Sequence, residues 1–322
     1  MSAKVFVFLV FVLLFAVSAS AMVFDLVDPA SFDANFAGAT ANDRLGFGGV
    51  AFGDADADGF NDDLILTSYW SDPFGRSKAG EAYLILNVGS KSGEVDLADS
   101  ANFDANFAGA TADDELGSGG VAFGDADADG FNDDLILQAH WSDPFGRSKA
   151  GEAYLILNVG DKSGEIDLAD PSNFDANFAG ATADDRLGSG GVAFGDADAD
   201  GFNDDLILQA WASDPFGRDL AGEAYLILNV GDKSGEVDLA DPSNFDANFA
   251  GAAAGNVLGA IGVAFGDADA DGFNDDLILQ SFYANPFGRI FAGEVYLILN
   301  VGDKSGEVDL ADPANFDANF AG

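Results

Sequence analysis

The chain has 322 residues, with 56 acidic and 13 basic side chains and a formal net charge of −43. Nucleic acids and anionic membrane surfaces are bound through Lys and Arg, so this charge disfavours both kinds of partner. The sequence has no Cys and one His, His140, which excludes disulfides, Cys nucleophiles, zinc fingers and multi-His metal centres. Hydrophobic residues make up 48% of the chain, enough for a folded core.

The first 21 residues have the pattern of an export signal. Lys4 supplies a positive start, residues 5–17 are apolar, and Ala19-Ser20-Ala21 is a small-residue cleavage pattern. An uncleaved membrane anchor is the alternative, because residues 5–24 carry no charge and could just span a bilayer. No later apolar stretch is long enough to do so. We therefore expect a mature protein that is secreted or held at the cell surface, with no membrane insertion of its own.

The remainder of the chain repeats with a period of 71 residues. The heptapeptide Phe-Asp-Ala-Asn-Phe-Ala-Gly recurs at that interval, beginning at Phe32, Phe103, Phe174, Phe245 and Phe316. The mature chain, residues 22–322, is therefore one repeat array with partial copies at both ends. Its four full repeats, called units 1 to 4 below, cover residues 32–102, 103–173, 174–244 and 245–315.

Short strands separated by Gly, Asp, Asn and Pro are the dominant pattern within a unit. In unit 2 we predict strands at Gly120–Phe123, Leu135–Gln138 and Glu152–Leu157, and a fourth in either Glu165–Leu168 or Asn173–Phe178. Four short strands in tandem repeats predict an all-β fold, a β-propeller of four-stranded antiparallel blades that forms a small closed ring or a partial propeller. A β-solenoid or an open array of blades is the alternative.

Each unit carries the acidic loop Asp-x-Asp-x-Asp-Gly-Phe-Asn-Asp-Asp between its first two predicted strands. Side chains at loop positions one, three, five and nine and the backbone carbonyl at seven offer an all-oxygen shell, which suits Ca²⁺. An EF-hand is excluded because Ile65 stands at position twelve and the flanks are strand-like. The alternative is a solvated acidic turn, in which the carboxylates would repel one another.

We thus predict about four Ca²⁺ sites. The expected ligands are Asp54, Asp56, Asp58, Phe60 and Asp62 in unit 1; Asp125, Asp127, Asp129, Phe131 and Asp133 in unit 2; Asp196, Asp198, Asp200, Phe202 and Asp204 in unit 3; and Asp267, Asp269, Asp271, Phe273 and Asp275 in unit 4. The aspartates at position ten are competing ligands: Asp63, Asp134, Asp205 and Asp276.

The order of segments in unit 3, residues 184–196, then the acidic loop, 205–210 and 222–228, resembles an FG-GAP repeat. This is the blade unit of integrin α-subunit propellers and their bacterial relatives. The resemblance spans essentially the whole mature chain and implies a calcium loop between strands one and two and an extracellular binding or adhesion role. The chain departs from the family in having Gln138-Ala139-His140 in place of Gly-Ala-Pro, and four units where seven blades are usual.

Aromatic residues vary between the units at one place, the turn after the second predicted strand. We expect these residues at the end of the blades opposite the calcium loops, as a candidate ligand surface. Packing between blades is the alternative. The residues are Tyr69, Trp70, His140, Trp141, Trp211, Phe282 and Tyr283. The arginines that follow this turn are predicted to form salt bridges between blades: Arg76, Arg147, Arg218 and Arg289.

The expected function is that of a calcium-binding adhesion or binding module for an extracellular protein or glycan. A structural or matrix repeat protein is one alternative. A hydrolase on a propeller scaffold is a weaker one, since no nucleophile motif is present and nothing singles out a carboxylate pair. We therefore expect no enzymatic activity, and self-association is one way to complete the propeller.

Overall fold

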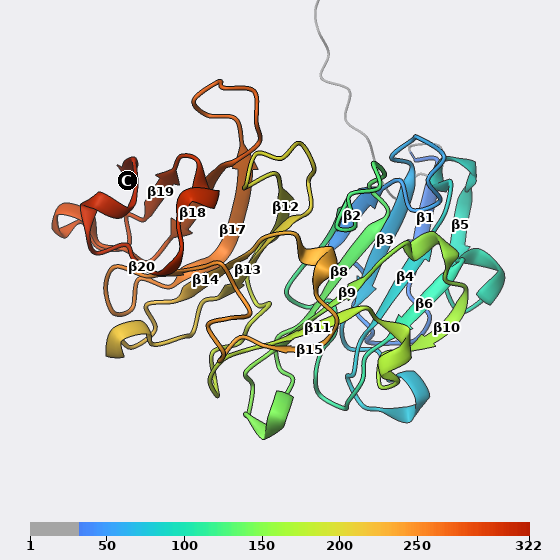
Figure 1. Ribbon diagram of the computed structural model, residues 1–322. Helices are drawn as coiled ribbons and strands as arrows, with labels where there is room; N and C mark the ends of the chain where they lie inside the picture. The colour runs from blue at the N-terminus through green and yellow to red at the C-terminus, as the bar shows by residue number, and fades with distance from the viewer. Residues whose placement is uncertain (1–31) are drawn as a thin grey trace, which may run out of the picture.

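The computed structural model describes residues 32–322, so the predicted export signal lies outside the described residues (Figure 1). The described chain forms 21 strands in four larger sheets and one two-stranded pair. Sheet 1 contains β2 (Val50–Gly53), β3 (Asp63–Ser68), β4 (Glu81–Ile85), β6 (Ala105–Ala108) and β10 (Gly164–Asp167). Sheet 2 contains β7 (Val121–Gly124), β8 (Asp134–Ala139), β9 (Glu152–Ile156), β11 (Ala176–Ala179) and β15 (Gly235–Asp238). Sheet 3 contains β12 (Val192–Gly195), β13 (Asp205–Ala210), β14 (Glu223–Ile227), β16 (Ala247–Ala250) and β20 (Gly306–Asp309). Sheet 4 contains β17 (Leu258–Gly266), β18 (Asp276–Ser281), β19 (Glu294–Ile298) and β21 (Ala318–Ala321), and the pair is β1 (Ala34–Ala37) with β5 (Gly93–Asp96).

Three-residue 3-10 helices occupy several of the connections. They are η2 (Pro73–Gly75), η3 (Val88–Ser90), η4 (Ser100–Asn102), η5 (Pro144–Gly146), η6 (Val159–Asp161), η7 (Pro171–Asn173), η8 (Pro215–Gly217), η9 (Val230–Asp232), η10 (Pro286–Gly288), η11 (Val301–Asp303) and η12 (Pro313–Asn315).

The all-β prediction is confirmed, and the first three strands of unit 2 lie within a residue or two of their predicted positions. The prediction of four antiparallel strands per blade was incomplete. Both candidates for the fourth strand are strands, β10 and β11, and sheets 1 to 3 each have five strands. The outermost pair in each of these sheets is parallel, as in β10 with β6.

The additional strand comes from the following unit. In sheet 2, β7, β8 and β9 belong to unit 2, whereas β11 begins unit 3 and β15 ends it. Each of units 2 to 4 therefore contributes its first and last strands to the preceding sheet and the three strands between them to its own. Neighbouring sheets are consequently interlocked by the chain itself, in addition to the contacts between their faces.

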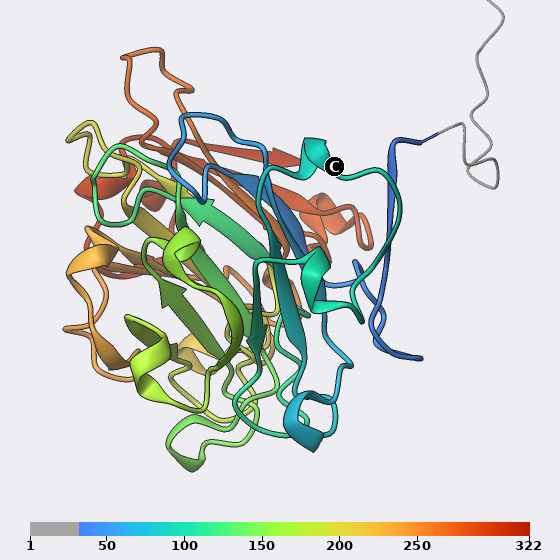
Figure 2. The same cartoon turned by 90° about the vertical axis from the view of Figure 1, so that its right-hand side faces the viewer.

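The hydrophobic core lies between the faces of successive sheets. Phe107 of sheet 1, for example, shares a buried cluster with Leu135 and Tyr154 of sheet 2. The sheets follow one another in order, with β2 against β7, β7 against β12 and β12 against β17. Sheets 1 and 4 lie at opposite ends of this row, and no sheet is closed on itself (Figures 1 and 2).

A regular contact holds each sheet to the next. A Phe ring covers the glycine that ends the first strand of the preceding sheet, so that a Cβ on Gly124 would lie 2.3 Å from the ring of Phe194. Within each sheet, an arginine pairs with an aspartate that the next unit contributes, as Arg147 does with Asp238 of β15 at 2.7 Å. Arg76 and Arg218 form equivalent pairs, with Asp167 and Asp309, so these arginines join successive units within one sheet and not, as the sequence predicted, one blade to another. Arg289 instead donates a hydrogen bond to the carbonyl oxygen of Gly322.

Candidate metal sites and the opposite aromatic end

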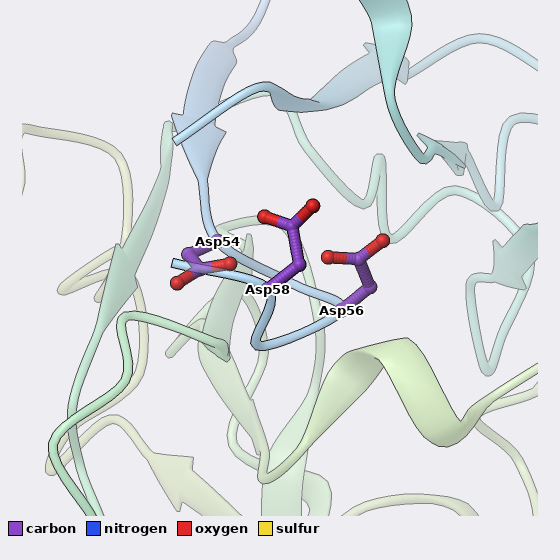
Figure 3. A group of neighbouring side chains, drawn as sticks. All are labelled: Asp54, Asp56 and Asp58. Carbon is purple, nitrogen blue, oxygen red and sulfur yellow. The ribbon is translucent and has the colours of Figure 1, made fainter. Parts of the chain in front are cut away.

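Three carboxylates converge in the acidic loop of every unit, between the first and second strands of its sheet. Figure 3 shows Asp54, Asp56 and Asp58 on a single turn of the chain, with carboxylate oxygens within 4.8 Å of one another. Gly59 has a φ of 94°, a conformation that favours glycine, and its N–H donates to Asp54. The same arrangement occurs in units 2 to 4, at Asp125, Asp127 and Asp129; Asp196, Asp198 and Asp200; and Asp267, Asp269 and Asp271.

The adjacent aspartates at positions nine and ten have different environments. Asp134, at position ten, is fully buried and accepts backbone hydrogen bonds on both oxygens, from Asn158 at 2.7 Å and Asp127 at 3.0 Å. Asp133, at position nine, is 4% exposed, and its Oδ1 has no hydrogen-bond partner among the described residues. The three other units repeat both environments: the free oxygens are on Asp62, Asp204 and Asp275, and the backbone acceptors are Asp63, Asp205 and Asp276.

The electrostatics of the loop fit a cation. Burial, followed by repulsion from neighbouring carboxylates such as Asp129 and Asp127, raises the pKa of Asp133 to about 6. Asp204 has its pKa raised to about 6, first by burial and then by Asp200. A buried carboxylate oxygen with no donor is costly unless a positive charge compensates it. Each loop has one oxygen of this kind, and with the three carboxylates of its triad it offers a hard, all-oxygen donor set, which is compatible with Ca²⁺ rather than a softer metal.

An asparagine of the next turn also reaches each loop, a residue that the sequence reasoning missed. Asn158 lies in the left-handed region at φ 50°, and its Nδ2 donates to Asp127 Oδ2 at 2.9 Å. The signal was present, because an Asn-Val-Gly segment follows the third-position aspartate at the same spacing in every unit. The equivalent residues are Asn87, Asn229 and Asn300.

The predicted ligand positions Phe60, Phe131, Phe202 and Phe273 lie in the loops with their side chains exposed.

The variable aromatic residues lie beyond the other end of the second strand, away from the acidic loops. Tyr69 is buried, Tyr283 is exposed, and Trp70, His140, Trp141, Trp211 and Phe282 are half-buried. Several of these rings bridge neighbouring units. Trp70 donates from Nε1 to Glu115 of unit 2 at 3.1 Å. The Arg186 guanidinium lies 4.8 Å from the ring centre of Trp141 and 5.2 Å from that of Trp211.

A hollow of about 390 Å³ adjoins this aromatic end. It is lined by Trp141, Asp143, Lys149 and Glu152, with the buried Asp114 at its wall. Burial, and secondarily the negative charge of Glu152, raises the pKa of Asp114 to about 7. In unit 3, burial and Glu223 raise the pKa of Asp185 to about 7. The hollow therefore combines an aromatic face with several carboxylates and one amine.

These two buried carboxyls predict that, without calcium, stability falls as pH rises from 5 to 8. Their pKa values are raised by folding, so the folded state holds protons that the unfolded chain has released. The stabilisation is complete below pH 4 and is lost as pH rises through 7. Thermal melts in EGTA should show a decrease of roughly 5 kcal/mol across this range, since each carboxyl loses about two pKa units' worth of stabilisation. The Asp114→Asn, Asp185→Asn double variant should make the profile shallower, the remaining slope coming from loop carboxyls with raised pKa values such as Asp133 and Asp204, and an unchanged slope would contradict the assignment.

Comparison with known proteins adds no family to these observations. No protein-family model matches the chain, and no curated protein matches it either. Within residues 32–322, the structure contains no helix that is both long and apolar enough to cross a membrane.

Proposed function

We propose that this protein is a secreted or cell-surface module, a propeller-like array of β-sheets that is stabilised by about four calcium ions and binds a protein or glycan without catalysis. One observation carries the proposal. The same carboxylate triad recurs in four units, each beside a buried aspartate oxygen that has no hydrogen-bond partner among the described residues. The FG-GAP resemblance of the sequence agrees with this role, because such blades carry a calcium loop at the same place.

The proposed role of calcium is structural. In unit 2, the cation would be held by Asp125, Asp127, Asp129 and Asp133, with the backbone carbonyl of Phe131. Asp134 would keep its present hydrogen bonds and hold the loop against the following turn. Binding would neutralise repulsion within the loop and couple the metal to folding.

The proposed ligand surface is the aromatic end. Over most of their length the units are near-copies, but here unit 2 has His140-Trp141 where unit 3 has Trp211-Ala212 and unit 4 has Phe282-Tyr283. Aromatic side chains supply large contact areas at low entropic cost. The hollow beside Trp141 adds carboxylates that can accept hydrogen bonds from sugar hydroxyls or from basic peptide groups.

The function is tested by screening the mature chain against arrays of glycans and extracellular proteins, with calcium and with EGTA. We expect binding in calcium that Trp141→Ala and Tyr283→Ala weaken about tenfold or more. Phe145→Ala is the matched control, because Phe145 is exposed but lies outside the variable positions. Binding that is equally strong in all variants would place the ligand elsewhere, and the absence of any ligand would favour a structural or matrix role.

A further inference from the structure

The two end sheets expose large apolar side chains that are buried at the same repeat position elsewhere. Phe52 of sheet 1 is 58% exposed, whereas its equivalent in sheet 2, Phe123, is 8% exposed. Phe320 of sheet 4 is 59% exposed, whereas its equivalent in sheet 3, Phe249, is fully buried. The sequences are the same at these positions, so the difference is whether another sheet covers them. Sheet 4 therefore has an uncovered apolar face. On sheet 1 the uncovered part is around Phe52, because Leu64 and Tyr83 of the same sheet are buried against the β1–β5 pair.

The same Phe–Gly contact recurs between successive sheets, and each end face carries one of its two residues. Between successive sheets, Phe123 covers Gly53, Phe194 covers Gly124 and Phe265 covers Gly195. At the ends, Phe52 has no glycine to cover, and a Cβ on Gly266 would meet no atom within 4 Å in the described structure. One end of the row of sheets therefore exposes the aromatic side chain of Phe52, and the other end exposes Gly266, the glycine that such a side chain would cover.

A backbone hydrogen bond between neighbouring sheets also lacks its donor partner at one end of the row and its acceptor partner at the other. Gly231 donates its N–H to the carbonyl oxygen of Ala126 in the preceding unit at 3.0 Å, and Gly302 does so to Ala197. The equivalent glycine of unit 1, Gly89, has open space around it. The equivalent alanine of unit 4, Ala268, is exposed.

The ion pairs between units follow the same rule. Each joins an arginine to an aspartate of the next unit, as Arg218 is joined to Asp309 at 2.6 Å. Within residues 32–322, Arg289 of unit 4 has no carboxylate partner, and Asp96 of unit 1 has no arginine partner. A contact between the two ends would supply each with the group that its equivalents already have.

The outer strands are also interchangeable. β5 pairs with β1 in the register in which β20 pairs with β16, with Ala34 opposite Gly93 as Ala247 is opposite Gly306. β1 and β21 have the same sequence, Ala-Asn-Phe-Ala, and β21 is the outer strand of sheet 4 with no parallel partner in the described chain. β5 therefore fits β21 as well as it fits β1.

We propose that the outer face of sheet 1, which is uncovered around Phe52 and lies under the β1–β5 pair elsewhere, docks on the uncovered face of sheet 4 in a second copy of this chain. Phe52 of one copy covers Gly266 of the other, and Asp96 pairs with Arg289. In the docked state β5 no longer pairs with β1 of its own chain and pairs instead with β21 of the second copy. The two strands have the same sequence, and only one of them can lie beside β5, so β1 is displaced. Within residues 32–322, sheets 1 and 4 lie at opposite ends of the row with sheets 2 and 3 between them, so they do not cover one another, and the proposed occupant is a second copy (Figure 1).

At one place the proposed contact between the two copies differs from the contacts between sheets of one chain. A Cβ on Gly119 would lie 1.4 Å from the carbonyl oxygen of Gly188, so the backbones there approach very closely. Unit 4 has Ile261 at this position, and unit 1 has Phe47 where unit 2 has Ser118. Both side chains are exposed. The junction therefore replaces a close backbone approach with an apolar contact between Ile261 and Phe47.

The two faces are different, so the association is head to tail, which closes into a ring or extends as a chain of copies. It requires no assumption about calcium or about the ligand. Sedimentation velocity of the mature chain, in calcium and over a wide concentration range, is expected to show species of at least two chains that dissociate on dilution.

Two variants each block one face. Phe52→Asp removes the ring, and Gly266→Val fills the space that the ring would occupy. Each is expected to weaken self-association about tenfold or more, and an equal mixture of the two is expected to form a dimer that extends no further. Phe145→Asp is the control, because Phe145 is equally exposed in unit 2 and lies on neither end face.

Three results would overturn the proposal. The first is a wild-type chain that stays monomeric at every concentration. The second is association that neither variant weakens. The third is a monomer whose melting temperature falls with both variants but not with the control, which would mean that the two faces meet within one chain. Circular dichroism of each variant establishes that a loss of association is not a loss of folding.

Discussion

Calcium is expected to raise the melting temperature of the mature chain by about 10 °C or more relative to EGTA, with a much smaller effect of magnesium. A site at about 100 times its dissociation constant adds about 2.7 kcal/mol to folding, so four sites add roughly 10 kcal/mol. In a chain of this size each kcal/mol moves the melting temperature by about 2–4 °C. Magnesium demands a small octahedral shell with several waters, which suits these wide loops poorly. Calorimetric titration should find about four calcium equivalents.

Two neighbouring aspartates allow a matched pair of variants. Asp133→Asn should remove one calcium equivalent and leave stability in EGTA unchanged or slightly higher, because Oδ1 of Asp133 has no donor to lose. Asp134→Asn should lower stability in EGTA by about 1–3 kcal/mol, because one of its two backbone hydrogen bonds would face an amide N–H. A folded protein with no calcium-dependent shift would reject the metal sites, and equal effects of the two variants would reject their separate roles.

Local features of the fold were predictable from the sequence. The acidic loops and the first three strands of each unit are specified by residues close together in the chain, where turn chemistry and strand patterning act directly. The segment Gly164–Asp167 was harder, because its four residues pair with Ala105–Ala108 of the preceding sheet. Its partner is chosen by packing between sheets, which no local pattern records.

In the candidate metal site, too, some features follow from the local sequence and others depend on residues of a distant turn. The triad at Asp125, Asp127 and Asp129 follows from alternate spacing in one loop. The distinction between Asp133 and Asp134 depends on the backbone N–H of Asn158, a residue of another turn. The bridging of Trp141 and Trp211 by Arg186 was likewise invisible in the sequence, which left recognition and packing as alternatives for these rings.

A valine at Gly195 is expected to lower the stability of the chain by about 3 kcal/mol, since overpacking a tight contact costs this much when neither side can move. A Cβ at this position would lie 2.3 Å from the Phe265 ring of the next sheet. The same substitution at Gly266, in the same sequence and at the end of an equivalent strand, meets no neighbour within 4 Å.

Gly266→Val should therefore leave the melting temperature of the chain nearly unchanged in dilute solution, where copies are apart. Unit 4 already carries Ile261 where the three earlier units have glycine, so a β-branched side chain is compatible with a face that no sheet of the same chain covers. Chemical denaturation of the two variants compares them directly. Equal losses would mean that glycine is required by the strand itself, and a loss confined to Gly195→Val would show that the requirement comes from the neighbouring sheet.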